Sequence, residues 1–355
     1  MSSSKEPLRL DKEDLFSPRV DAYLEERDAL SRGLVEVPTT PLFFRILYAS
    51  WFYLAIAGAL GAFLAWLVLE PFMDESAVVQ PSVVVSLLLF PTVSGSIGLF
   101  LGLVDGIMCR NPQRAFTCAV VGLGIGFGLG LVGVLAAGMV FSIMVQLAGA
   151  IDPNFLRGQM PGGFAFLVLM MGRGAAWAVA AISAGVGQGI ALKERKVVLN
   201  GLLGGVLGGL IGGLLFDPID LLFSGGVRAT VSRAVGFTVI GLMVGLFVGL
   251  VEQWTKTAWV IMRAGPLAGK QFVIHRNPTV LGSSPKADIY LFKDADIEPR
   301  HALIHNLGGR YEIEDCNTPD GTYVNGKPVQ RQLLQHGDQI VLGKTVLEFA
   351  LREAK

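Results

Sequence analysis

The stretch GLLGGVLGGLIGGLL, residues 201–215, decides how the middle of the chain is read. It contains no charged residue, and glycines recur in it at intervals of four. It lies inside a long apolar segment and follows no strand, so it does not fit the pattern of a nucleotide-binding loop. Small residues at this spacing let apolar helices approach each other closely. The stretch therefore predicts a helix that packs inside a bundle of apolar helices.

The same character extends over residues 46–253. These 208 positions hold only 18 charged residues, about 9%, and 35 of the 45 glycines. A soluble domain averages about 25% charged residues, so the region predicts a glycine-rich α-helical transmembrane domain and excludes a wholly soluble enzyme. The whole chain has 29 basic and 29 acidic residues. This balance gives it no reason to bind nucleic acid.

Six segments are long enough to cross a bilayer, which takes about 20 mostly apolar residues. Lys and Arg gather in the N-terminal tail and in the second-to-third and fourth-to-fifth connections, whereas the other connections carry few. Because cytoplasmic loops are enriched in these residues, we expect both termini in the cytoplasm and the chain in a bacterial inner membrane. The six segments are approximately residues 46–69, 83–108, 115–146, 164–191, 197–222 and 230–253.

The six segments form three pairs that look like copies of one helical hairpin. Each odd-numbered segment is expected to end in an acidic residue followed by proline, and each even-numbered segment in a turn that contains a polar residue. Within the three pairs, the polar residue follows the acidic one by 35, 36 and 35 positions. The pattern predicts three hairpin repeats. Its glycines favour tight packing or homo-oligomerisation, and a transport pathway is the alternative. The markers are Glu70-Pro71, Asp152-Pro153 and Asp217-Pro218, followed by Asp105, Gln188 and Glu252.

Arg173 is the one charged residue whose position the sequence leaves open. If the fourth segment begins at Phe164, Arg173 is near the middle of the bilayer and must pair or line a cavity. If the segment begins near Gly174, Arg173 flanks the membrane. The likeness between residues 172–177 (GRGAAW) and 232–237 (SRAVGF) favours the second alternative.

The sequence contains no recognisable catalytic, metal-binding or cofactor-binding site. The three cysteines, Cys109, Cys118 and Cys316, are too few and too scattered for a disulfide framework or a thiolate metal site. His301 and His305 lie on one predicted strand without a third ligand. Residues 1–45 carry no signal peptide, and we expect a partly disordered cytoplasmic tail with a short helix at residues 20–31.

In the remaining residues, 256–355, the sequence pattern changes from that of long apolar helices to that of short strands. Short β-rich runs alternate with turns, from WVIMRAG (259–265) to TVLEFAL (345–351), which predicts an all-β sandwich or barrel. Asn325-Gly326 is a strong signal for a two-residue hairpin, because both positions tolerate positive φ. The chain is therefore expected to join a six-span bundle to a cytoplasmic β-domain.

Four motifs within this region resemble the forkhead-associated (FHA) family. In order they are TVLGSSPKADIYL (279–291), DIEPRHALIH (296–305), YEIEDCNTPDGTYVNG (311–326) and LLQHGDQIVLG (333–343). The resemblance covers about residues 260–352. It implies an 11-stranded β-sandwich whose loops at one end bind phosphothreonine in a partner protein.

The loop residues depart from the family at the phosphate site. Ser283 stands where the family has its phosphate-binding arginine, Glu298 replaces a phosphate-contacting serine, and Asp320 replaces a peptide-binding asparagine. Two readings stay open: a protein-binding domain that needs no phosphate, or a rearranged phosphopeptide site. The resemblance gives as partner-binding residues Ser283, Ser284, Lys286, Glu298, Arg300, Thr318 and Asp320, and as the scaffold of the site Gly282, His301, Asn325 and Gly326.

Three candidate functions can be weighed against these sequence features. The first is a membrane-anchored signalling or adaptor protein whose cytoplasmic FHA-like domain binds a protein or phosphopeptide partner. The second is a transporter or channel regulated by that domain, which would need polar groups at mid-bilayer. The third is an enzyme, but the sequence contains no recognisable nucleophile–base pair or metal-binding motif. The sequence favours the adaptor.

Overall fold

The computed structural model describes residues 41–73, 83–157, 161–223 and 229–352. These residues form two compact units, a helical one over Leu42–Thr257 and a β-domain from Ala258 onward. The predicted tail, up to residue 40, and its short helix at residues 20–31 lie outside the described residues.

The helical unit contains six helices that are long and apolar enough to cross a membrane, judged by length and composition. The prediction of six such helices is confirmed. The first begins four residues later than expected, at Ser50, because a separate short helix precedes it. The helices are α2 (Leu42–Leu47), α3 (Ser50–Leu69), α4 (Val83–Met108), α5 (Pro112–Ile151), α6 (Gly163–Leu192), α7 (Arg195–Phe223) and α8 (Ala229–Thr255), with short 3₁₀ turns η2 (Glu70–Phe72) and η3 (Phe155–Arg157).

The six long helices form a closed ring in chain order. Each packs against the next, and α8 packs against α3 to close the ring. The centre is filled by alanine, valine, isoleucine and leucine side chains of α3, α4, α6 and α8 together with the buried rings of Trp177 and Phe237. The apolar surface that points away from this centre stays exposed, as Val132 on α5 and Phe164 on α6 illustrate.

Reciprocal glycine pairs join the helices at three interfaces. Gly98 faces Gly122 between α4 and α5, Gly185 faces Gly201 between α6 and α7, and Gly241 faces Gly58 between α8 and α3. At each pair, a Cβ added to either glycine would overlap the carbonyl oxygen of the other. The close helix contacts that the glycine spacing predicts are therefore present.

The same three interfaces each carry an ion pair. Asp105 of α4 binds Arg114 of α5 at 2.8 Å, and Arg173 of α6 binds Asp217 of α7 at 2.9 Å. Between α8 and α3, Arg233 binds Glu70. Each pair joins two predicted hairpins and not the two helices of one hairpin, so the charged residues of the bundle hold neighbouring hairpins together.

The structure corrects two expectations about α6 and α7. Asp217-Pro218 lies inside α7, which continues to Phe223, so this acid–proline pair does not end its helix. The fourth long helix begins at Gly163 and not near Gly174, so Arg173 is its eleventh residue. Its guanidinium lies over the rings of Phe141 and Phe216 and pairs with Asp217. Arg173 is therefore ion-paired within the helix, as the first alternative required.

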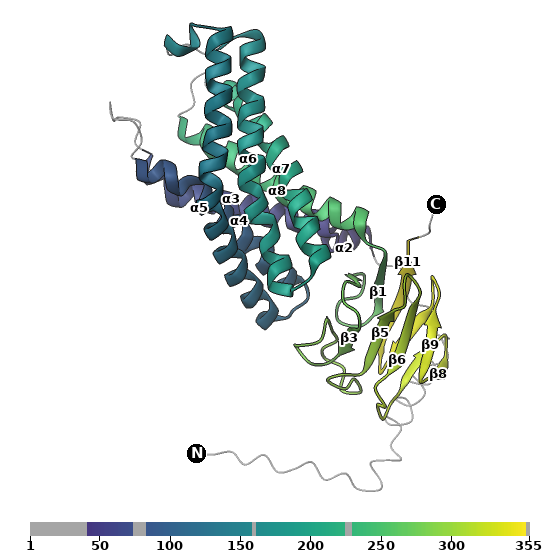
Figure 1. The fold of residues 1–355 in the computed structure, drawn as a ribbon. Coiled ribbons are helices and arrows are strands. Elements are labelled where there is room, and N and C mark those ends of the chain that lie inside the picture. The colour runs from purple at the N-terminus through teal and green to yellow at the C-terminus, as the bar shows by residue number, and fades with distance from the viewer. Residues whose placement is uncertain (1–40, 74–82, 158–160, 224–228, 353–355) are drawn as a thin grey trace, which may run out of the picture. The chain divides into compact units, whose positions relative to one another are not determined.

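Helix α5 is much longer than its neighbours, with 40 residues, or about 60 Å at 1.5 Å per residue. Its first half carries the glycines that pack against α4. Its second half and the first part of α6 run side by side beyond the ends of the other helices (Figure 1). Large apolar side chains remain exposed there, including Leu135, Met139 and Ile143.

The C-terminal unit is an 11-stranded β-sandwich, as the resemblance implied. One sheet has the order β2-β1-β11-β10-β7-β8 and the other β4-β3-β5-β6-β9. The short strands β8 and β9 were not predicted, because one contains a proline and both are largely polar. The strands are β1 (Ala258–Ala264), β2 (Gln271–Val273), β3 (Thr279–Gly282), β4 (Ile289–Tyr290), β5 (Ala302–Asn306), β6 (Tyr311–Asp315), β7 (Thr322–Val324), β8 (Lys327–Val329), β9 (Arg331–Leu334), β10 (Gln339–Leu342) and β11 (Thr345–Leu351).

The predicted hairpin at Asn325-Gly326 joins β7 to β8. Both residues have positive φ, +50° and +75°. The side chain of Asn325 donates to Asp338 at 2.8 Å and accepts from the backbone N–H of Gln339 at 2.9 Å. The turn is thereby fixed to the start of β10.

Candidate functional site

Three loops meet at one end of the sandwich: residues 283–288 between β3 and β4, residues 291–301 between β4 and β5, and residues 316–321 between β6 and β7. We call these residues the loop cluster. The backbone N–H of Ser283 donates to the carbonyl of Glu298 at 2.9 Å. Gly282 lies against Pro299 so closely that an added Cβ would overlap the proline carbonyl. The first two loops are therefore in direct contact.

His301 connects the second loop to the third. Its side chain is fully buried, and its Nδ1 accepts a hydrogen bond from the backbone N–H of Glu298 at 3.2 Å. This assigns the proton to Nε2, which lies 3.1 Å from the carbonyl oxygen of Gly321 and 3.2 Å from Oγ1 of Thr318. The ring thus braces the loops, the role that the resemblance gave it.

Asp315, at the end of β6, orders the third loop. Its carboxylate accepts hydrogen bonds from Thr318 Oγ1 (2.8 Å), from the backbone N–H of Thr318 (3.0 Å) and from Thr322 Oγ1 (2.7 Å). Burial raises the pKa of Asp315, but the bonds from Thr322 and Thr318 outweigh it, so the net pKa lies below its usual value. Asp315 was not singled out from the sequence, although the spacing Asp-x-x-Thr is a recognisable signal for such a turn.

The predicted partner-binding residues belong to these three loops. Lys286, Glu298 and Arg300 are exposed, and the other four predicted residues are partly exposed. Within the first loop, Ser284 Oγ accepts from the backbone N–H of Lys286 at 3.2 Å. Burial raises the pKa of the Cys316 thiol on the third loop, which keeps it protonated at neutral pH. The positive charge of Arg300 acts on the same thiol, where it favours a lower thiol pKa.

Asn325 and Gly326 are not part of the loop cluster. They follow β7, whereas the third loop precedes it, so they lie at the opposite end of that strand. Their hydrogen bonds go to Asp338 and Gln339. Their assignment to the scaffold of the site is corrected accordingly: they shape the β7–β8 hairpin.

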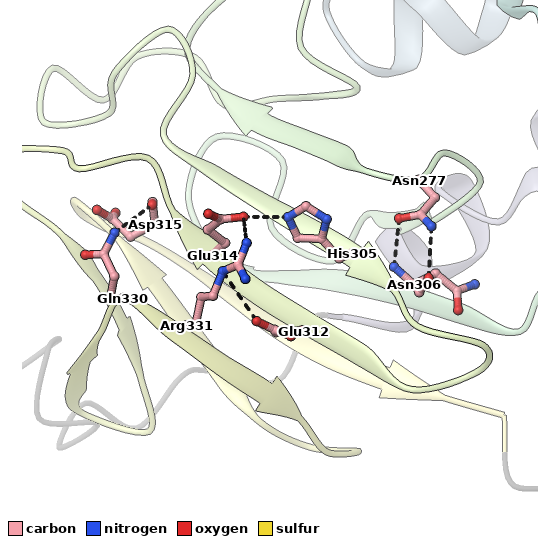
Figure 2. Close-up of polar contacts among 8 residues, drawn as sticks. All are labelled: Asn277, His305, Asn306, Glu312, Glu314, Asp315, Gln330 and Arg331. Carbon is pink, nitrogen blue, oxygen red and sulfur yellow. Dashed lines mark hydrogen bonds and ion pairs between the residues drawn. The ribbon is translucent and has the colours of Figure 1, made fainter.

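A separate polar network covers the outer face of the five-stranded sheet. Figure 2 shows Glu314 between His305 and Arg331, with Arg331 also next to Glu312. Glu314 Oε2 lies 2.7 Å from His305 Nε2 and accepts from Arg331 at 2.8 Å. Hydrogen bonds from Arg331, and then from His305, hold the pKa of Glu314 below its usual value. Within the described parts of the chain, no three His, Cys, Asp or Glu side chains are grouped to hold a metal ion.

The C-terminal unit matches a known protein family. Residues 279–343 match the family model described as FHA domain. The oxoglutarate dehydrogenase inhibitor of Corynebacterium jeikeium is 37% identical over 93 residues, 26% of this chain and 64% of that protein. The glycogen accumulation regulator GarA of Mycolicibacterium smegmatis is 36% identical over 93 residues, 26% of this chain and 58% of that protein. The chain thus spans less than two thirds of the length of either relative.

Solved structures match the same unit. The FHA domain of CT664 protein from Chlamydia trachomatis has 24% identity and a TM-score of 0.26, with 28% of this chain and 100% of that chain covered. A domain solved in a structural and functional analysis of phosphothreonine-dependent FHA domain interactions gives the same identity, coverage and TM-score.

Proposed function

Because the C-terminal part of the chain is an FHA domain, we propose that the protein is a membrane-anchored signalling or adaptor protein that presents this domain to a protein partner in the cytoplasm. The observation that carries the proposal is the joining of three converging, partly exposed loops to six apolar helices in one chain. The partner binds at the loop cluster.

The membrane part of the proposal rests on where the basic residues lie. Short turns at one end of the bundle connect α4 to α5 and α6 to α7, and Arg110, Lys193, Arg195 and Lys196 lie at these turns. Since cytoplasmic connections are rich in Lys and Arg, this end faces the cytoplasm. The N-terminal tail and the FHA domain, which join the bundle at Leu42 and Thr257, are then on the same side.

The centre of the bundle favours an anchor over a channel. The ring of Trp177 contacts those of Phe90 and Phe237 edge to face, with centroids 4.8 and 5.7 Å apart. Phe237 also contacts Phe216 at 5.9 Å. Packed rings and small apolar side chains make up most of this layer, and the hydroxyls of Ser94 and Ser183 are used in hydrogen bonds to the carbonyl of Ala180. An ion would have to lose its hydration without compensation to pass this layer.

The hairpin repeat is part of the proposal. The three reciprocal glycine pairs and the three ion pairs all join consecutive hairpins, which is what three copies of one packing unit would produce. In this proposal the copies differ in length at one end, since Asp217 lies inside α7 whereas Glu70 and Asp152 follow the last residue of their helices.

The relatives suggest what kind of partner to expect. Their names describe an inhibitor of a dehydrogenase and a regulator of glycogen accumulation, and FHA domains are binding modules without catalytic chemistry. We infer that this chain likewise acts by binding another protein, at the membrane, and not as an enzyme.

Two measurements test the proposal. Reporter fusions at residues 1 and 355 should both report the cytoplasm; opposite sides would contradict the six-span topology. The tagged full-length chain, captured from membranes after crosslinking, should retain a partner that is lost with Ser284→Trp in the loop cluster. Lys327→Trp, on an exposed site in β8, is the matched control and should keep the partner. Equal loss or equal retention with both variants would contradict a partner site at the loop cluster.

A further inference from the structure

Several hydrogen-bond donors of the loop cluster, mainly backbone N–H groups, are already used within it. The backbone N–H of Ser283 donates to Glu298, that of Lys286 to Ser284, and that of Gly321 to Thr318. Thr318 donates hydrogen bonds from both its backbone N–H and its hydroxyl to Asp315. The Nε2–H of His301 faces the Gly321 carbonyl. A phosphate group, which is bound through several convergent donors, would find these donors already engaged.

One strong acceptor of the loop cluster is, by contrast, unengaged. The side chain of Glu298 is exposed, and among the described residues its carboxylate makes no hydrogen bond or ion pair. Its backbone is held on both sides, because its N–H donates to His301 and its carbonyl accepts from Ser283. The backbone of Glu298 is therefore fixed at the meeting point of the first two loops, and its carboxylate is left open to solvent.

The positive charges nearby do not cancel this carboxylate. Among the described residues, Arg300 makes no ion pair with Glu298, although its charge is close enough to Cys316 on the third loop to act on the pKa of that thiol. Lys286 is exposed on a flexible side chain and makes no ion pair with Glu298. A second negative charge, such as that of a phosphate, would be repelled by Glu298, whereas an ammonium or guanidinium would gain a charge-assisted hydrogen bond from it.

We propose that Glu298 receives a lysine or arginine side chain of an unphosphorylated partner. The inference rests on the proposed function, since it names the chemistry recognised at the same loops. The hydroxyl groups of Ser283 and Ser284, next to the point where Glu298 contacts the first loop, supply neutral hydrogen bonds to the partner's backbone. The domain thereby selects for a basic residue, and phosphorylation next to that residue weakens binding.

Peptide libraries with one fixed central residue test the proposal on the full-length chain in nanodiscs. The central residue is Arg, Lys, Thr or phosphothreonine, and the flanking positions are randomised. We expect the Arg and Lys libraries to bind at least tenfold more tightly than the phosphothreonine library. Glu298→Gln should remove this preference, and Glu298→Arg should reverse it in favour of phosphothreonine. Glu312→Gln, which removes a carboxylate on the outer sheet face, is the matched control and should leave the preference intact.

The outcomes separate the inference from the function on which it rests. Preferential binding of phosphothreonine by the native chain would overturn the inference and leave partner binding at the loops in place. An unchanged Arg and Lys preference in Glu298→Gln would also overturn it, because the basic residue would then be bound elsewhere. Binding of no library, together with a partner that survives Ser284→Trp in the capture experiment, would overturn both.

Discussion

The guanidinium of Arg233, near the start of α8, donates two hydrogen bonds to the carboxylate of Glu70, which follows α3. The two residues are 163 positions apart, and their bond closes the ring of helices between its last and first members. The indole N–H of Trp66 donates to the same carboxylate at 2.8 Å. The Glu70 carboxylate thus fixes two side chains, one from α8 and one from α3.

Replacing Arg233 by alanine should destabilise the bundle. Both partners are largely buried, so removal of the guanidinium leaves Glu70 without its charge partner. A lost hydrogen bond to a charged group costs about 1.5–3 kcal/mol. We expect a lower midpoint of thermal unfolding in detergent, with little change for Lys196→Ala, whose side chain is exposed. Equal midpoints for the two variants would show that the pair is not needed to close the ring.

The paired glycines predict a contrast within one substitution type. Gly201→Ala would place a methyl group against the carbonyl of Gly185 and force α6 and α7 apart. Gly124→Ala, on the exposed face of α5, meets nothing within 4 Å. Alanine favours a helix over glycine by about 1 kcal/mol, so Gly124→Ala should leave stability unchanged or raise it while Gly201→Ala lowers it. Thermal unfolding of both variants in the same detergent decides the matter.

The hydrogen bonds of Asp315 predict a dependence of stability on pH. Its folded pKa is depressed, so its contribution is fully present above the unfolded value of about 3.9 and is lost as the pH falls through the folded value. Asp315→Asn should therefore destabilise the FHA domain at pH 7. The difference from the native chain should shrink below about pH 4. A difference that stays constant from pH 7 to pH 3 would show that the charge of Asp315 is not what orders the loop.

Restoring the family's residues should create phosphate binding. With Ser283→Arg and Glu298→Ser together, a guanidinium replaces a hydroxyl and the repelling carboxylate is gone. A charge-assisted hydrogen bond adds about 1.5–3 kcal/mol, which corresponds to a gain of roughly ten- to a hundredfold in affinity for phosphothreonine peptides. Calorimetric titration of both chains with the same peptides measures it, and tight phosphate-dependent binding by the native chain would show that Lys286 or Arg300 already serves as the phosphate ligand.

The helices and strands were largely predictable, because periodicity and charge density report on local surroundings. The six apolar helices follow from the scarcity of charge, and the Asn325-Gly326 turn follows from its need for positive φ. The expected helix start near Gly174 was wrong, because α6 begins at Gly163 and includes Arg173. The charge of Arg173 is paired there with Asp217, a residue of another helix that no local pattern identifies. Pro218 predicts a helix end, but tertiary packing carries α7 past it.

At the candidate site too, the sequence predicted the local features and did not predict the tertiary contacts. The family's motif order located the loops, and His301 braces them as expected. The role of Asp315 depends on hydrogen bonds that form only when the third loop closes onto β6 and β7. The donors consumed inside the loop cluster, which decide what Glu298 can bind, become visible only when the backbone is folded.

The packed rings of Trp177, Phe90 and Phe237 have a consequence for the cell that makes this protein. If the bundle is the membrane anchor that we propose, these rings close it to water and protons, and the energised state of the membrane is then independent of how many copies are inserted. Expression can then follow the amount of partner that has to be held at the membrane, with no penalty in respiratory efficiency. Trp177→Ala would remove the largest of these rings and couple copy number to growth rate.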